Sequence, residues 1–345
     1  AGAAATQRRP CGVGCARGHR MQGTCRTARV RAAHISSSDG LRCSRRRSCV
    51  ACSPPGSPKP PPMPAPVRLR YGEAHPRQWG RLFLPSERPD AAGTSLFPIL
   101  VLFHGGWWKN KWHLDAGAGD WKVGMESLIE CFTMRRVAVF QVEYRLRDDE
   151  NGGFPGSNED CLLAVQFVEE LSNIYPVDPY NMGLLGHSAG GTLALWVAGE
   201  LRRRASKVAL KVVVAAAACT DLRKAHELRL SDEGDAVLQY MKVAPEDDPE
   251  LYNEACPSSR LPIGVPQILL VGGKDVDVPP EMNEEYVTRA TEAGDRVMLV
   301  LRESRDHYEI VGPHLTNSQD DVESLIQAIN QITGGSFVPE ETQQT

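Results

Sequence analysis

A serine between small residues carries the strongest chemical signal in the sequence. Ser188 lies at the centre of Gly-His-Ser-Ala-Gly at 186–190, directly after the apolar run 182–185 and before the helical run 192–201. A nucleophilic serine on a tight strand-to-helix turn needs small neighbours, because the two backbones approach closely there. The spacing alone is also met in plain glycine-rich turns. Its position between a strand and a helix predicts a nucleophile.

A second chemical signal is the segment His-Gly-Gly-Trp-Trp at 104–108, which follows another apolar run. An enzyme that transfers acyl groups must stabilise a developing oxyanion with preorganised N–H donors. A glycine pair after a strand lets the backbone turn its amides inward, and the residue after the serine supplies a further amide. We therefore assign Gly105, Gly106 and Ala189 to an oxyanion hole and expect a structural role for His104.

The nucleophile also requires a general base, and three histidines follow it in the chain. They are His226, His307 and His314. In enzymes whose nucleophile lies on this type of turn, the catalytic residues follow the chain order serine, acid, histidine. His226 precedes every suitable acid, so it does not fit this order. His314 lies at the start of the last predicted helix, whereas His307 follows the predicted strand 296–301. We favour His307 as the base.

Two aspartates compete for the acid that orients this base. Asp275 and Asp277 both lie in the loop after the apolar run 267–271. We prefer Asp275, and we expect Asp277 to cap the helix that begins at the proline pair 279–280. Under this hypothesis Ser188 and His307 complete a catalytic triad with Asp275.

The elements that would position these residues alternate between strand and helix. Continuous apolar runs of this length are typical of central strands in a parallel sheet covered on both faces. Strands are predicted at 67–71, 81–84, 98–104, 137–142, 182–185, 208–217, 267–271 and 296–301, and helices at 158–171, 192–201, 281–293 and 316–332. The alternation predicts an α/β fold with a mostly parallel central sheet and helices on both faces. The segment 221–261 interrupts it and is predicted to be a small helical cap over the carboxyl edge of the sheet, where ligands bind in such folds.

Charge divides the chain into two parts. The whole sequence carries 39 basic and 43 acidic residues, a net charge of −4. Residues 1–70 hold 14 basic side chains and one acid, Asp39, which leaves a net charge of −17 for residues 71–345. An acidic body repels phosphate, so a nucleic-acid partner is not expected. The sequence also lacks an apolar run of 18 residues, so no membrane span is expected.

Composition suggests the domain boundaries. We expect a disordered basic leader at 1–52, a proline-rich linker at 53–66, one α/β domain at 67–337 with its cap at 221–261, and a disordered tail at 338–345. The linker holds eight prolines, a composition typical of an extended spacer.

The leader is rich in arginine and serine and poor in acids. Three interpretations stay open: an organelle transit peptide, a mis-assigned start, and a basic binding arm. An intracellular protein is expected, in a plastid or mitochondrion if the leader is a transit peptide and otherwise in the cytoplasm. The six leader cysteines lack the paired spacing of a zinc site, and no His/Asp cluster stands at ligand spacing in the sequence. We expect neither a metal nor another cofactor.

Several motifs in order resemble those of one superfamily. The motifs are 104–108, Gly-His-Ser-Ala-Gly-Gly at 186–191, Asp-x-x-Val-Pro-Pro at 275–280 and Asp-His-Tyr at 306–308, with further landmarks at 143–145 and 154–160. They resemble the α/β-hydrolase superfamily over residues 67–333, and more narrowly its serine carboxylesterase and kynurenine formamidase (arylformamidase) branch. The resemblance implies a Ser-His-Asp hydrolase that acts on small esters or aryl formamides.

The substrate pocket is less well indicated. Trp107 and Trp108 are either core anchors or pocket walls, and Phe154 and Tyr308 would add apolar surface. The short cap suggests a small-molecule ester or amide as the partner, and the oligomeric state is open. Two alternatives remain: an oligopeptidase or other amide hydrolase, and a non-catalytic small-molecule-binding protein on a hydrolase fold.

Overall fold

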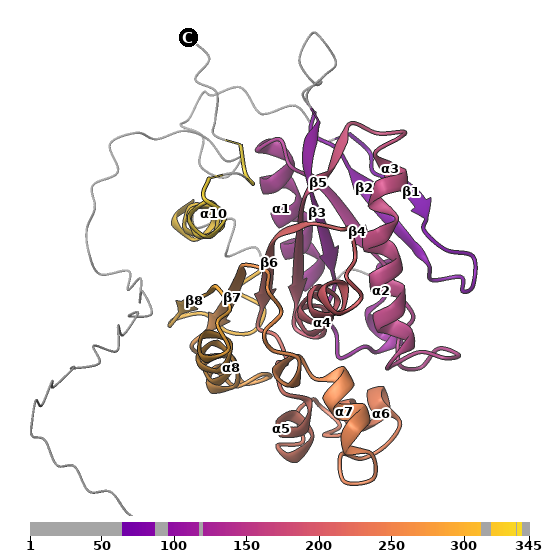
Figure 1. Ribbon diagram of the computed structural model, residues 1–345, viewed down its shortest axis with the longest axis vertical. Helices are drawn as coiled ribbons and strands as arrows, with labels where there is room; N and C mark the ends of the chain where they lie inside the picture. The colour runs from indigo at the N-terminus through magenta and orange to yellow at the C-terminus, as the bar shows by residue number, and fades with distance from the viewer. Residues whose placement is uncertain (1–63, 87–95, 117–119, 312–318, 336, 340–345) are drawn as a thin grey trace, which may run out of the picture. The chain divides into compact units, whose positions relative to one another are not determined.

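The computed structural model describes residues 64–86, 96–116, 120–311, 319–335 and 337–339 (Figure 1). The predicted leader and most of the linker lie outside these residues, as does His314. The predictions made for them therefore stay predictions.

One eight-stranded sheet forms the centre of the described domain. Its spatial order is β1-β2-β4-β3-β5-β6-β7-β8. The strands are β1 Val67–Arg70, β2 Trp79–Phe83, β3 Phe97–Phe103, β4 Ala138–Val142, β5 Val177–His187, β6 Leu210–Ala216, β7 Gln267–Gly272 and β8 Val297–Arg302. The pairs β1–β2 and β2–β4 are antiparallel and all others are parallel. The predicted, mostly parallel sheet is confirmed.

Alternate residues of each central strand enter two different cores. In β3, Ile99 and Val101 belong to one apolar cluster, while Leu100 and Leu102 belong to the cluster on the other face. Because successive side chains of a strand point to opposite faces, a sheet covered on both sides needs this unbroken apolar run.

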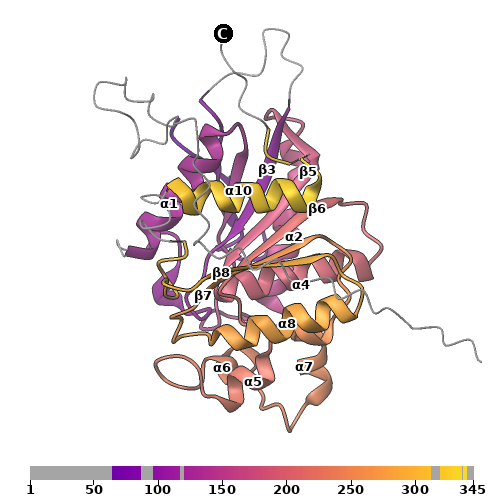
Figure 2. The ribbon, with the colours of Figure 1, turned by 90° about the vertical axis from the view of Figure 1, so that its left-hand side faces the viewer.

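Helices cover the two faces in separate groups (Figures 1 and 2). The helices are α1 Asp120–Met134, α2 Gly156–Gln166, α3 Val168–Leu171, α4 Ala189–Arg203, α8 Pro280–Glu292 and α10 Gln319–Thr333. Side chains of α1 and α10 share one core with the sheet, and those of α2, α3, α4 and α8 share the other. The predicted α/β architecture with helices on both faces is confirmed.

The predicted cap is present and helical. It follows β6 and contains α5 Leu222–Glu227, α6 Ala236–Met241 and α7 Pro249–Ala255, with the short 3-10 helix η2 Pro257–Ser259 at its end. In both ribbon views α5, α6 and α7 lie together at one end of the sheet (Figures 1 and 2). This placement positions the cap next to the ends of the strands that carry the candidate residues.

Two details differ from the sequence-based expectation. The helix α1 was not predicted, and Val338, which was assigned to the tail, is buried against the same core as α10. The packed domain therefore extends past residue 337. Among the residues described, no helix is both long and apolar enough to cross a membrane.

Candidate active site

Ser188 occupies a strained turn between β5 and α4. Its backbone has φ 55° and ψ −122°, a conformation that residues other than glycine rarely adopt. A Cβ on Gly186 would lie 2.0 Å from the carbonyl oxygen of Gly190, so the turn closes only with a glycine there. This geometry is that of the predicted nucleophile elbow, which raises the serine hydroxyl at the end of a strand.

The residue before this serine ties the turn to the predicted base. His187 is buried, and its Nε2 lies 2.8 Å from the backbone oxygen of His307, so the ring nitrogen donates to that carbonyl. Burial lowers the pKa of His187 to about 3, and the nearby charge of His307 acts in the same direction. His187 is therefore neutral at ordinary pH. Sequence reasoning treated it only as the variable position of the motif.

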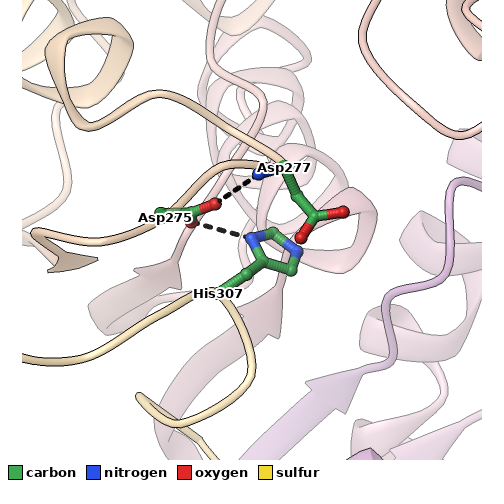
Figure 3. A group of neighbouring side chains, drawn as sticks. All are labelled: Asp275, Asp277 and His307. Atoms are coloured by element: carbon green, nitrogen blue, oxygen red, sulfur yellow. Dashed lines mark hydrogen bonds and ion pairs between the residues drawn. The ribbon is translucent and has the colours of Figure 1, made fainter.

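Asp275 and His307 meet as predicted, at the ends of β7 and β8. The Nδ1 atom of His307 lies 2.7 Å from Oδ2 of Asp275, and both residues are buried (Figure 3). The other carboxylate oxygen of Asp275 accepts the backbone N–H groups of Asp277 at 2.9 Å and Val278 at 2.8 Å. This arrangement fixes the carboxylate and leaves Nε2 of the imidazole to take a proton from a nucleophile.

Ser188 and His307 are brought to the same region without a direct hydrogen bond. Within the described part of the chain, no hydrogen bond joins the hydroxyl of Ser188 to the imidazole. The link runs through His187, which neighbours the serine and holds the backbone of His307. Catalytic hydrogen bonds often tighten only when substrate is bound, so this geometry is compatible with a base.

Asp277 does not cap a helix, so that expectation was wrong. The N-terminal cap position of α8 is Pro279, and no side chain accepts a hydrogen bond there. The carboxylate of Asp277 instead lies beside the imidazole of His307 (Figure 3). Burial raises the pKa of Asp277, while the charge of His307 opposes this shift.

The fold also creates a cluster that the sequence spacing did not reveal. Asp275, Asp277 and His307 each place one potential metal-ligand atom within 4.8 Å of the others. Both oxygens of Asp275 already accept hydrogen bonds, one of them from the imidazole. We therefore interpret the cluster as an oriented histidine with a second carboxylate beside it.

The oxyanion loop lies directly on the nucleophile elbow. A Cβ on Gly105 would lie 2.8 Å from the backbone oxygen of His187 and 3.0 Å from Cβ of Ser188. The amides of Gly105, Gly106 and Ala189 donate no hydrogen bond to any described residue. Their assignment to an oxyanion hole stays a prediction.

His104 has the structural environment that the sequence predicted. Its Nε2 is 3.4 Å from a carboxylate oxygen of Glu143, and its ring stacks on Tyr144 with centroids 4.5 Å apart. The hydroxyl of Tyr144 donates to the backbone oxygen of His104 at 2.7 Å. These contacts support the start of the oxyanion loop.

The four residues proposed for the pocket fall into different environments. Trp108 is fully buried and stacks on Tyr240 of the cap, so its ring offers no surface to a substrate. Trp107 is also buried, at 6% exposure, and Phe154 is half-buried with its edge on Trp196. Tyr308 is 47% exposed, and its ring lies 5.1 Å from that of His307. Tyr308 is the member best placed to contact a ligand.

Comparison with known proteins places the chain in a family. The BD-FAE family model matches residues 87–289, which is more than half of the chain. The chain therefore belongs to the BD-FAE family, and it is an α/β-hydrolase of the carboxylesterase type. The predicted resemblance to this superfamily is thereby confirmed, whereas the narrower likeness to kynurenine formamidases stays a prediction.

Solved structures show the same fold. Carboxyl esterase 2 from the fungus Tuber melanosporum matches with a TM-score of 0.60 and 21% identity, over 80% of this chain and 88% of that one. A bacterial heroin esterase matches with a TM-score of 0.61 and 20% identity, over 80% and 85% of the two chains.

Two curated relatives are similar in sequence. Arylacetamide deacetylase of Bos taurus is 31% identical over 137 residues, 38% of this chain and 31% of that protein. The probable mitochondrial carboxylesterase 4 of Arabidopsis thaliana is 24% identical over 272 residues, 72% of this chain and 70% of that protein. The match thus spans about a third of the bovine protein's length and over two thirds of the plant protein's.

Proposed function

We propose that the protein hydrolyses small carboxylic esters through an acyl-enzyme formed on Ser188. The hydrogen bond between Asp275 and Nδ1 of His307, built next to the strained serine turn, carries this proposal. That bond selects the tautomer in which Nε2 is free to accept a proton.

The mechanism follows from the roles that the geometry supports. The hydroxyl of Ser188 attacks the ester carbonyl carbon while His307 takes its proton, and the C–O bond then breaks as the imidazolium returns the proton to the leaving alcohol. Water attacks the acyl-enzyme by the same route, which releases the acid. Amides of the oxyanion loop and of Ala189 stabilise the oxyanion in both halves, an effect worth about 3–4 kcal/mol per donor.

The names of the relatives support a small substrate. Those proteins are called carboxyl esterase, heroin esterase, carboxylesterase and arylacetamide deacetylase. The cap of this chain is short, which also favours a small acyl group. Aryl formamides are a second candidate class, favoured by the motif pattern at 104–108 and 275–280.

A substrate panel with matched variants tests the proposal. Wild-type protein should hydrolyse p-nitrophenyl acetate and butyrate, and Ser188→Ala should lose on the order of 10³-fold or more in kcat/KM. Ser259→Ala, which changes an exposed serine of the cap, should match the wild type. Equal activity of Ser188→Ala and wild type would refute the mechanism, and an inactive wild-type protein would favour a binding function.

The same panel separates esters from formamides. If the protein is a formamidase, N-formylkynurenine should be turned over faster than p-nitrophenyl acetate. Ester turnover without formamide turnover would exclude the formamidase hypothesis and leave the esterase proposal intact.

A further inference from the structure

The oxyanion loop is held in a conformation that its own sequence does not favour. Gly106, Trp107 and Trp108 follow one another with φ of 107°, 50° and 57°. Tryptophan has no intrinsic preference for this left-handed region, and such strain persists only where the surroundings enforce it. The contacts of this loop therefore show what maintains the arrangement of its amides.

The cap supplies an aromatic contact to this loop. The ring of Trp108 stacks on Tyr240 of α6, with centroids 4.0 Å apart and planes inclined by 16°. Tyr240 is itself fixed, because its backbone oxygen accepts the N–H of Phe154 at 2.9 Å and its hydroxyl bonds to Asn158. The cap residue is thus anchored to the body of the domain while it covers the loop.

The cap also supplies the countercharge of a buried lysine. Lys109 directly follows the strained residues, and its side chain is only 6% exposed. Its ammonium group pairs with Glu233 of the cap and lies 3.9 Å from Asp232. A lysine this deeply buried requires an acidic partner, since an unpaired charge there is costly.

A second buried cation, Arg147, is hydrogen-bonded to the same loop through its backbone. Arg147 is only 5% exposed. Its backbone N–H donates a hydrogen bond to the backbone oxygen of Trp108 at 2.7 Å, and its backbone oxygen accepts a hydrogen bond from Nζ of Lys242 at 2.5 Å. The hydrogen bond from Lys109 lowers the pKa of Glu233, and the charges of Lys109 and Arg147 act in the same direction. Glu233 is therefore ionised at ordinary pH and pairs with a buried lysine.

We propose that the cap latches the oxyanion loop through Lys109 and Glu233, so that these two side chains are positioning residues for the oxyanion hole. Lys109 does not act on substrate, because its ammonium group is buried and occupied by cap carboxylates. The neighbouring pair of Lys111 and Asp232, at 3.7 Å, is exposed on both sides and contributes little to the latch. This inference rests on the proposed esterase function.

A latch that positions the oxyanion hole has a distinct kinetic signature. Glu233→Gln keeps the shape of an exposed side chain and removes its charge, while the carboxylate of Asp232 still lies 3.9 Å from the ammonium group of Lys109, so the fold should survive. We expect kcat to fall about tenfold for acetate and butyrate esters alike, with KM changed less than about threefold. The Ki of a trifluoromethyl ketone, which binds as a tetrahedral adduct, should rise by the same factor as kcat falls.

Two further variants sharpen the test. Lys109→Met breaks the pair from the other side and should show the same pattern, whereas Lys111→Met should behave as wild type. An unchanged kcat in both Glu233→Gln and Lys109→Met would overturn the proposal, as would a rise in KM at constant kcat. Ester turnover that depends on Ser188 shows in the same assay that the proposed function holds even where the latch fails.

Discussion

Ser188, Asp275 and His307 follow the ends of strands in one sheet, whereas the oxyanion loop is supported by a cap inserted far away in the chain. On the strand side, main-chain geometry and short hydrogen bonds between adjacent loops fix the side chains. On the loop side, the Trp108–Tyr240 stack and the Lys109–Glu233 pair join segments more than 120 residues apart. Two kinds of support thus meet at the candidate active site, and we expect substitutions in them to have different effects.

The largest effect should come from breaking the strand side at its base. His307→Ala removes the proposed general base for Ser188, so kcat/KM should fall on the order of 10³-fold or more. The oxyanion amides are untouched, so a residual rate above the buffer blank should remain in steady-state assays on p-nitrophenyl acetate. A loss of less than about tenfold would show that another residue is the base.

The two aspartates beside this histidine should differ strongly. Asp275→Asn removes the acceptor that selects the tautomer of His307 and should cost about 10²-fold or more, though less than His307→Ala. Asp277→Asn removes a carboxylate that contacts the imidazole by no hydrogen bond and should change kcat/KM little. Kinetics of both variants on one ester compare the two roles, and the reverse ranking would exchange the assignments.

The contact surface between the two sides can be altered with one methyl group. Gly105→Ala places a Cβ against the backbone oxygen of His187, so the oxyanion loop must shift away from the serine turn. We expect kcat to fall by roughly tens-fold, since misplacing one donor costs somewhat less than deleting it. A tetrahedral inhibitor should weaken in parallel. Wild-type kinetics in this variant would mean that the loop does not supply the donors.

The smallest predicted effect concerns stability and pH. The folded-state pKa of His187 is about 3, below its value in the unfolded chain, so the unfolded state binds an extra proton between about pH 6.5 and pH 3. Stability from this group is therefore present above pH 6.5 and is lost as pH falls, by about 2 kcal/mol between pH 7 and pH 5.

His187→Gln keeps an N–H for the backbone of His307 and cannot titrate. Urea unfolding at pH 7 and pH 5 should show a smaller loss of stability in this variant than in the wild type. If the free energy of unfolding fell equally in the two proteins between pH 7 and pH 5, that result would contradict a buried, neutral His187.

The positions of Ser188, Asp275 and His307 could be predicted from the sequence because the motifs that mark them are local. The small residues around Ser188, and the loops holding Asp275 and His307, stand directly after apolar runs that form parallel strands of one sheet. Parallel strands bring their carboxyl ends to one edge, so order along the chain was enough to collect these residues. The helix α1 was missed although its buried residues Met125, Leu128, Ile129 and Phe132 have helical spacing.

The loop side could not be predicted in the same way. Nothing near Trp108 in the sequence indicates Tyr240 as its partner, and nothing near Lys109 indicates Glu233. Contacts of this kind depend on how the cap folds back over the sheet. Likewise, the position of Asp277 beside His307 depends on the conformation of a loop rather than on its spacing, so the helix-cap expectation failed.

Mapping the covalent adduct of a fluorophosphonate probe by peptide mass spectrometry tests the identity of the nucleophile most directly. We expect one adduct per chain, on Ser188, and no adduct in the Ser188→Ala variant. An adduct on a different residue, or ester turnover by a protein that the probe leaves unmodified, would contradict this expectation.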